Sequence, residues 1–208
     1  MQSLGGMPLA EFVYRRCATS RKSDIAAIVT SSEDSDNELF EYCISKDIPV
    51  FRGPLDNVLE RYILAAEFYA SPLVCRVCGD SPFVDTGLID NMFDLMEREA
   101  LDYVAPDKKF CMAGLDSEAV TLDALKRSRR ASTAKDELEH VTLYIKNNAD
   151  NFSTKYIKTD LKPRDLDAVS ITVDYPEDLD VCNKILKLAG NKSSFRSEDI
   201  FDAMRIGR

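Results

Sequence analysis

The sequence predicts an α/β protein built on a doubly wound, mostly parallel sheet. Helical and strand-like segments alternate along most of the chain, which is the pattern of strands joined by helices. The strand-like runs are short and almost wholly apolar, as in strands buried on both faces. The 208 residues, 45% hydrophobic and 30% charged, suffice for one substantial core. We expect one domain over residues 1–190 and a tail with a short helix over residues 191–208.

The first third of the chain begins with a helix over residues 8–19. Leu9, Phe12 and Cys17 fall on one face of it, and Pro8 suits a first-turn position. A short apolar run, an amphipathic segment, a second apolar run and a second amphipathic segment then predict strand, helix, strand and helix, at residues 25–30, 35–46, 49–51 and 56–69.

The same alternation continues to the end of the chain. A strand, a helix and a strand are expected over residues 73–78, 86–99 and 102–105, followed by an irregular stretch around Gly114. The remaining apolar patterns predict two helices, a strand running into a helix, and a short last helix, over residues 122–130, 134–147, 168–173, 176–189 and 197–204.

Composition excludes several classes of function. A net charge of −9 and a pI near 4.8 argue against a dedicated DNA- or RNA-binding protein, which needs a basic face. No stretch approaches the roughly 20 apolar residues that span a bilayer. The first six residues have no basic segment followed by an apolar one, so they do not resemble a signal peptide. We therefore expect a cytoplasmic protein without a membrane partner.

The six cysteines are scattered, and one pair raises the possibility of redox or metal chemistry. Cys75 and Cys78 form a C-x-x-C pattern. The pair lies inside a strand-like run rather than at a helix start, where thiol pKa values fall. No second cysteine pair or histidine completes a zinc site, so buried thiols are the favoured interpretation.

Two aspartates stand where this architecture places a ligand. Asp80 and Asp174 each come after the end of an apolar strand, with a proline shortly after. Ligands of open α/β sheets bind beyond the carboxyl ends of the strands. If the two strands are neighbours, the carboxylates converge and suit a hard cation such as Mg²⁺. The alternative is that both are helix N-caps, because an aspartate before a first-turn proline is a common capping arrangement.

Four segments, in a fixed order, resemble the cytidylyltransferase family that includes spore coat polysaccharide proteins of the SpsF type, with acylneuraminate and 3-deoxy-manno-octulosonate cytidylyltransferases as wider relatives. They are V-F-R-G followed by D-N-V-L-E-R-Y (50–62), R-V-C-G-D-S-P (76–82), D-E-L-E-H-V-T-L-Y-I (136–145) and T-V-D-Y-P-E-D-L (172–179). The resemblance implies a Rossmann-like nucleotide-diphospho-sugar transferase fold. It also implies transfer of CMP from CTP to a sugar or sugar acid with release of pyrophosphate.

The resemblance assigns roles residue by residue. Asp80 and Asp174 are its Mg²⁺ ligands. Residues near the nucleotide or sugar are Arg52, Asp56, Arg76, Gly79, Asp116, Glu139 and His140. Glu118 falls in the same G-L-D-x-E piece as Asp116, at the border of the sugar site. His140 is the only histidine, and packing beneath the sugar pocket is an alternative role for it. No residue is assigned as a catalytic acid or base.

The resemblance departs from the family at the front of the chain. Family members begin with an apolar strand and a basic loop that wraps the triphosphate, whereas this chain starts with a segment that resembles the one directly after that loop. We therefore expect the first strand to be missing and the cytidylyltransferase activity of the chain as written to be negligible. The alternative is a non-catalytic relative that binds a sugar nucleotide or a protein. A glycosyltransferase with a similar sheet would need an Asp-x-Asp metal motif, and the Asp178–Asp180 match lies inside a predicted helix. The resemblance also implies a homodimer, because relatives commonly pair through the region after the middle strands. The apolar content of residues 138–145 is consistent with a buried or shared surface there.

Overall fold

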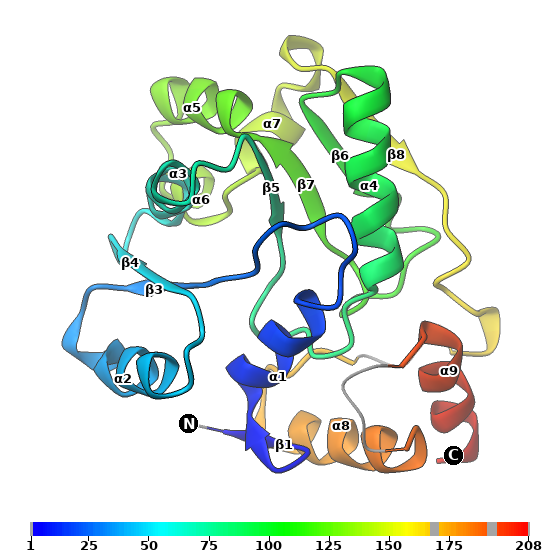
Figure 1. Cartoon of the computed structure of the whole chain (residues 1–208). Helices are drawn as coiled ribbons and strands as arrows, with labels where there is room; N and C mark the ends of the chain where they lie inside the picture. Colours follow the sequence, from blue (N-terminus) through cyan, green and yellow to red (C-terminus); the bar gives the residue numbers. More distant parts are fainter. Residues whose placement is uncertain (1, 167–170, 191–194, 208) are drawn as a thin grey trace.

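The computed structural model describes residues 2–166, 171–190 and 195–207 (Figure 1). Strands alternate with helices along the chain, in the order β1 (Ser3–Leu4), β2 (Met7–Pro8), α1 (Leu9–Cys17), β3 (Ile28–Ser31), α2 (Asn37–Ser45), β4 (Val50–Gly53), α3 (Val58–Phe68), β5 (Leu73–Arg76), α4 (Thr86–Glu99), β6 (Tyr103–Pro106), β7 (Glu118–Thr121), α5 (Leu122–Ala131), α6 (Lys135–Glu139), α7 (Leu143–Asn147), β8 (Thr154–Ile157), α8 (Pro176–Leu188) and α9 (Ser197–Ile206). Short 3-10 turns cover Asp34–Asp36, Ala149–Asn151 and Arg164–Leu166. The predicted α/β class is confirmed.

The strands form small mixed sheets rather than the mostly parallel sheet that we predicted. β3 and β4 pair in parallel, and a second sheet has the order β5-β7-β6-β8. Within it β6 and β8 are parallel, but β7 runs antiparallel to both β5 and β6. The cause is the connection between β6 and β7, which contains no helix. Parallel neighbours need a long crossover, usually helical, so a strand that returns directly pairs antiparallel.

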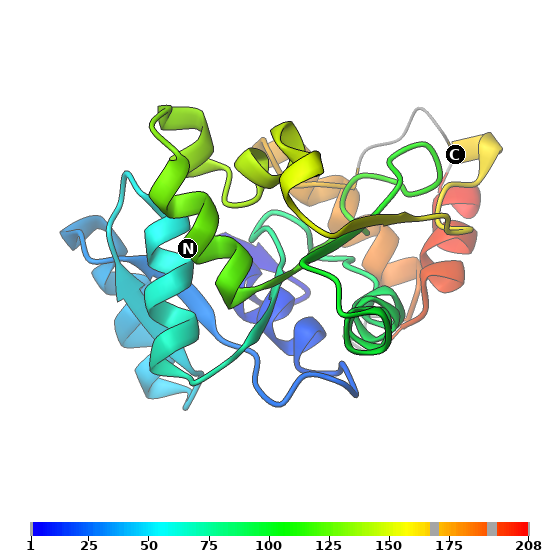
Figure 2. The same ribbon diagram turned by 90° about the horizontal axis from the view of Figure 1, so that it is seen from above.

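Helices cover both faces of the larger sheet and create two cores. Val104 of β6 and Ala119 of β7 are buried on the α4 side, in a cluster that also contains residues of α1, α8 and α9. Tyr103, Ala105 and Val120 point to the opposite face, where they pack with residues of α3 and α5. Figure 2 shows α4 and α5 on opposite sides of these strands. Alternate residues of one strand thus serve two helical layers, which explains why the strands are apolar throughout.

Three parts of the chain differ from the expected elements. The helix predicted over 134–147 is two helices, α6 and α7, separated at residues 140–142. Strands β7 and β8 fall where no strand was predicted. Half of the strand predicted over 168–173, residues 168–170, lies outside the described residues, and Ile171 to Val173 are in no strand.

The chain enters α1 through a hairpin of β1 and β2. Gly5 and Gly6 form its two-residue turn with φ values of 59° and 85°. A turn with positive φ at both central residues matches the twist of a hairpin and favours glycine. The Gly5 N–H donates to Oδ1 of Asn183 in α8 (3.0 Å), so the hairpin is anchored to the body of the protein.

The last helix packs on the main core. Ile200, Phe201 and Met204 of α9 are buried in the same cluster as Ile185 and Leu186 of α8. The boundary between a domain over 1–190 and a tail over 191–208 stays a prediction. No helix among the described residues combines the length and apolar character that a membrane crossing requires.

Candidate functional site

Asp80 and Asp174 are brought side by side by the backbone. The N–H of Val173 donates to the carbonyl of Asp80 (2.8 Å), so the segment that carries Asp174 runs directly against the turn after β5. The Asp80 carboxylate accepts from the Ser81 hydroxyl (2.9 Å), and that of Asp174 from the Thr172 hydroxyl (3.0 Å). Within the described residues neither carboxylate pairs with a cationic side chain.

Neither aspartate caps a helix. The N-cap of α4 is Asp85, whose Oδ1 accepts from the N–H of Leu88 (2.7 Å). At the start of α8 the N-cap is Tyr175, and Asp178 accepts from its N–H (2.8 Å). The capping interpretation of Asp80 and Asp174 is therefore wrong, because their helices are capped by other residues. This leaves both carboxylates available to a ligand.

Beside them lies a polar cavity of about 300 Å³. It is lined by Arg76, Cys78, Ser81, Lys108, Asp116, Ser117, Glu118, His140, Leu143 and Lys146. Of the residues that the sequence assigned to substrate, Arg76, Asp116 and His140 therefore come together here. They arrive from β5, from the loop before β7 and from the end of α6, three segments far apart in the sequence.

The floor of this polar cavity is a network centred on Glu118. Its Oε1 accepts from Tyr103 Oη (2.7 Å) and Lys146 Nζ (2.9 Å), and its Oε2 accepts from Thr142 Oγ1 (2.7 Å). Arg76 Nη1 pairs with Oε2 at 3.3 Å, across the β5–β7 register. Burial alone would raise the pKa of Glu118, but the Lys146 charge and the three hydrogen bonds outweigh it and lower the pKa to about 2. Glu118 is thus a fixed anion that positions two cations.

Arg52 does not line the polar cavity. It lies on β4, where Nε donates to the Ser31 carbonyl, Nη1 to Asn37 Oδ1 and Nη2 to the Glu33 carbonyl, each at 2.8 Å. These bonds tie the turn after β3 to the start of α2. All three guanidinium nitrogens are therefore used in holding the β3–β4 unit.

The remaining predicted substrate residues are exposed around the carboxyl ends of the strands. Asp56 comes after β4, and Glu139 ends α6 next to His140. Neither lines the polar cavity. Gly79 is exposed, and a Cβ added to it would meet no atom within 4 Å, so open space lies above the turn that precedes Asp80. The role of these residues stays a prediction.

Sequence reasoning missed the two lysines of the cavity. Lys146 sits on α7, six residues after His140, and Lys108 in the loop after β6. Lys108 is exposed and, within the part of the chain that the structure describes, makes no ion pair. The sequence offers no signal that separates Lys108 from its neighbour Lys109. In the sequence, Lys146 stands out only as a polar residue that directly follows the apolar stretch over 138–145.

The cysteines of the C-x-x-C pair are half-buried, one on β5 and one just after it. Burial raises the pKa of Cys75 to about 12 and also raises that of Cys78. Both are therefore protonated near neutral pH, and a protonated thiol is neither a good nucleophile nor a good metal ligand. Among the described residues, no group of three or more histidine, cysteine, aspartate or glutamate side chains is arranged to hold a metal ion.

Comparison with known proteins identifies one matching family model and two curated relatives. A family model described as cytidylyltransferase matches residues 1–190. An uncharacterized protein of Methanocaldococcus jannaschii is 34% identical over 155 residues, which cover 74% of this chain and 63% of that protein. The spore coat polysaccharide biosynthesis protein SpsF of Bacillus subtilis is 27% identical over 209 aligned positions, covering 96% of this chain and 84% of that protein. The chain thus spans less than two thirds of the archaeal relative's length.

Solved structures show the same fold at low sequence identity. A cytidylyltransferase from Leptospira borgpetersenii serovar Hardjo-bovis superposes with a TM-score of 0.89 at 22% identity, covering 99% of this chain and 86% of that chain. A CMP:2-keto-3-deoxy-manno-octonic acid synthetase complexed with CTP gives a TM-score of 0.63 at 12% identity, covering 89% and 90%.

Proposed function

Because this chain belongs to the cytidylyltransferase family, we propose that it activates a sugar or sugar acid with CTP in the biosynthesis of a surface polysaccharide. In this reaction an oxygen of the sugar attacks the α-phosphorus of CTP and forms a new P–O bond. The bond to the bridging oxygen breaks, pyrophosphate leaves with the electron pair, and the hydroxyl proton passes to solvent. We place the reaction in the cytoplasm, where CTP is available. The similarity to SpsF supports the link to polysaccharide synthesis.

The observation that carries the proposal is that two carboxylates, neither paired with a cation among the described residues, lie beside the polar cavity. Asp80 and Asp174 adjoin through the backbone and have only hydroxyl partners within the described residues. Carboxylate oxygens are the donors that Mg²⁺ prefers, and two of them leave room for phosphate oxygens in its shell. The donor set therefore fits Mg²⁺, which when bound would offset charge on the α-phosphate and the leaving pyrophosphate.

The side chains of the polar cavity supply binding and orientation. Arg76 is held toward the cavity by Glu118, and a guanidinium fixed in this way is preorganised for phosphate or carboxylate. Lys108 adds a positive charge at the rim. His140 is exposed there and offers a ring for a hydrogen bond to a sugar hydroxyl.

A second candidate is a relative that binds a sugar nucleotide without turnover. The observation that favours it is the shortage of uncommitted cations. Arg76 and Lys146 both already pair with Glu118, which leaves Lys108 as the cavity cation without an ion pair among the described residues. A triphosphate in the act of transfer needs several donors, and each one lost costs on the order of a hundredfold in rate.

The two candidates differ in the release of pyrophosphate. We would incubate the chain with Mg²⁺, one nucleoside triphosphate and one member of a panel of sugars and sugar acids, and measure pyrophosphate. CTP-dependent release that requires one sugar supports the transferase. Binding of CTP without release supports the binding relative. Equal release with ATP, GTP or UTP, or hydrolysis that needs no sugar, would contradict both.

A further inference from the structure

The loop between Asp80 and α4 is buried, although connecting loops normally lie at the surface. Ser81 is 4% exposed, and Phe83 and Val84 are fully buried. A loop that begins at a predicted metal ligand is thus enclosed by other parts of the chain. The contacts that enclose it determine how firmly Asp80 is held.

The C-terminal segment encloses this loop from one side. The ring of Phe195 meets the ring of Phe83 edge-on, with 5.6 Å between the centroids. The hydroxyl of Ser197, at the start of α9, donates to Oδ2 of Asp85, whose other oxygen caps α4. Residues 195–197 lie beyond the part of the chain that the cytidylyltransferase family model matches.

Arg16 of α1 fastens the loop to the C-terminal segment. It is 3% exposed, and its Nε donates to the Val84 carbonyl (2.9 Å) while its Nη1 donates to the Phe195 carbonyl (2.6 Å). Its guanidinium carbon lies 4.0 Å from the centroid of the Phe195 ring. Burial lowers the pKa of Arg16, and the negative charge of Asp85 acts against this change. One buried cation therefore joins α1, the loop after Asp80 and the C-terminal segment.

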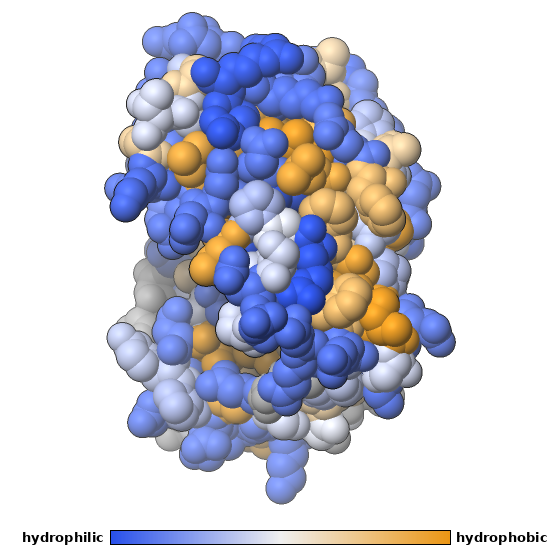
Figure 3. Space-filling view, turned by 90° about the vertical axis from the view of Figure 1, so that its left-hand side faces the viewer, coloured by the Kyte–Doolittle hydropathy of each residue, from blue (hydrophilic) through white to orange (hydrophobic). Residues whose placement is uncertain are grey.

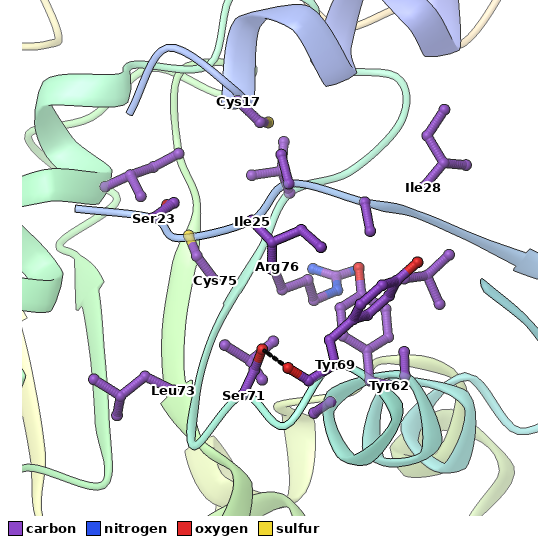
Figure 4. A pocket seen from close by; sticks show the side chains of 18 of the residues that line it. Cys17, Ser23, Ile25, Ile28, Tyr62, Tyr69, Ser71, Leu73, Cys75 and Arg76 are labelled. Atoms are coloured by element: carbon purple, nitrogen blue, oxygen red, sulfur yellow. Dashed lines mark hydrogen bonds between the residues drawn. The ribbon is translucent and has the colours of Figure 1, made fainter. Parts of the chain in front are cut away.

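These contacts are independent of the second, larger cavity of the molecule. That cavity has a volume of about 830 Å³, and Val13 and Cys17 of α1 line it. Figure 4 shows Cys17 pointing into it from α1. Arg16 does not line this cavity, because its hydrogen bonds hold it on another side of the helix.

Burial also distinguishes the Phe83–Phe195 contact from an aromatic contact at the surface. Phe68 is 69% exposed and lies 5.7 Å from the ring of Phe51, on the α2–β4–α3 side of the molecule, where apolar side chains reach the surface (Figure 3). Phe195 is only 8% exposed. A buried ring cannot move without opening a void, so the position of Phe195 fixes that of Phe83.

The enclosed loop is connected in turn to the second aspartate of the site. The N–H of Val173, next to Asp174, donates to the carbonyl of Asp80 (2.8 Å). The N–H of Asp85 donates to the carbonyl of Leu115 (3.0 Å), in the loop before β7 that contributes to the polar cavity. A shift of the enclosed loop would therefore change both the distance between the two aspartates and the wall of the cavity.

We propose that Arg16, Phe195 and Ser197 form a C-terminal clasp, a set of positioning residues that holds Asp80 beside Asp174. The inference rests on the proposed function for the role of these two aspartates. The C-terminal clasp acts through the loop over residues 81–85, which it restricts to one arrangement. Two carboxylates that are already in place bind a cation with a smaller loss of conformational entropy.

The test is amide hydrogen exchange in Ser197→Ala, followed residue by residue with NMR. The substitution removes the hydroxyl that bonds to Asp85 and leaves Arg16 and both rings in place. The amides of Val173 and Asp85 report on the loop, because their acceptors are the carbonyls of Asp80 and Leu115. We expect both amides to exchange about tenfold faster, which is the equivalent of about 1.4 kcal/mol and the order expected for a hydrogen bond to a charged group.

Two comparisons separate positioning from general stability. The amide of Leu122, which donates to the Pro72 carbonyl (2.8 Å) at the far end of β7, should exchange at nearly the same rate in Ser197→Ala. Ser128→Ala is the matched control, because Ser128 is also fully buried and its hydroxyl bonds to the Ala124 carbonyl (2.8 Å) within α5. It should leave the Val173 amide unchanged.

Calorimetry with CTP then tests the consequence for the site. Mg²⁺-dependent binding of CTP should weaken about tenfold in Ser197→Ala and not in Ser128→Ala. The same affinity in Ser197→Ala and the wild type would overturn the positioning role.

The exchange data decide the inference separately. Unchanged exchange of the Val173 and Asp85 amides in Ser197→Ala would overturn it. Equal acceleration at Leu122 would also overturn it, because the contact would then stabilise the whole fold. A wild-type chain that binds no CTP would contradict the proposed function instead, and the exchange of the Val173 amide would still decide whether the C-terminal clasp holds Asp80.

Discussion

Glu118 provides a sharp test of the network under the polar cavity. Replacing it by glutamine in Glu118→Gln keeps the shape but removes the charge that holds Arg76 and Lys146. The side chain is 13% exposed, so solvent screens the interaction little. The fall of its pKa from 4.5 to about 2 corresponds to about 3 kcal/mol, at about 1.4 kcal/mol per pKa unit. Removing one partner of a buried ion pair typically costs a similar amount.

The sign of the pH dependence is set by the direction of this pKa change. A carboxyl whose pKa is lower in the folded state stabilises the fold above its unfolded pKa, here 4.5, and loses that stabilisation as the pH falls through its folded pKa of about 2. The difference in unfolding free energy between wild type and Glu118→Gln should therefore be about 3 kcal/mol at pH 7 and should shrink toward zero near pH 2.

Urea denaturation followed by circular dichroism at several pH values measures this difference, since the chain has no tryptophan. Glu139→Gln is the matched control, because Glu139 is exposed and makes no ion pair among the described residues; its effect should stay within about 0.5 kcal/mol. A difference for Glu118→Gln that is equally small, or that does not change with pH, would refute the reasoning about the network.

Three further outcomes are expected. Arg52→Ala should lower the unfolding free energy by about 2 kcal/mol, because its hydrogen bonds hold the β3–β4 unit; unchanged urea denaturation would contradict this. Lys108→Glu should weaken CTP binding about tenfold in low salt by reversing a charge at the cavity rim, whereas Lys109→Glu, outside the cavity lining, should not; equal effects in calorimetry would count against a local role. We expect a homodimer by light scattering at micromolar concentration, and a monomeric mass would count against it.

The apolar stretch that was consistent with a dimer interface has another explanation in the structure. The apolar stretch over 138–145 suggested a shared surface, but Val141 and Ile145 are fully buried in the chain's own second core. Their apolar character is thus explained within one molecule. The dimer stays a prediction that now rests on the family resemblance alone.

Local patterns identified the helices well because each long helix carries both a period and an end signal. Residues 86–99 were predicted with the bounds that α4 has, where Asp85 caps the start and Ala100 in the left-handed region ends the helix. The strands β7 and β8 were missed because neither lies in a continuous apolar run: their sequences, E-A-V-T and T-K-Y-I, mix polar and apolar residues. Their pairing comes from contacts distant in sequence.

The candidate site was predictable only where it depends on local sequence patterns. Asp80 was identifiable from its position after an apolar run, and the architecture then placed it at a strand exit. The cavity around Arg76 depends on β7, which brings Glu118 opposite it, and a sequence without a predicted β7 cannot show that pairing. Arg52 shows that residue type alone does not fix a role, since a guanidinium suited to phosphate here donates to two backbone carbonyls. Its assignment to the nucleotide or sugar stays a prediction.

We expect Asp80 and Asp174 to bind a metal–nucleotide complex together, and calorimetric titration of CTP with and without Mg²⁺ would detect it. We predict weak Mg²⁺-dependent binding to the wild-type chain, lost in Asp80→Asn and in Asp174→Asn and retained in Asp150→Asn, which alters an exposed aspartate of another segment. The same CTP affinity in the wild type and in both site variants, or binding that does not depend on Mg²⁺, would contradict this expectation.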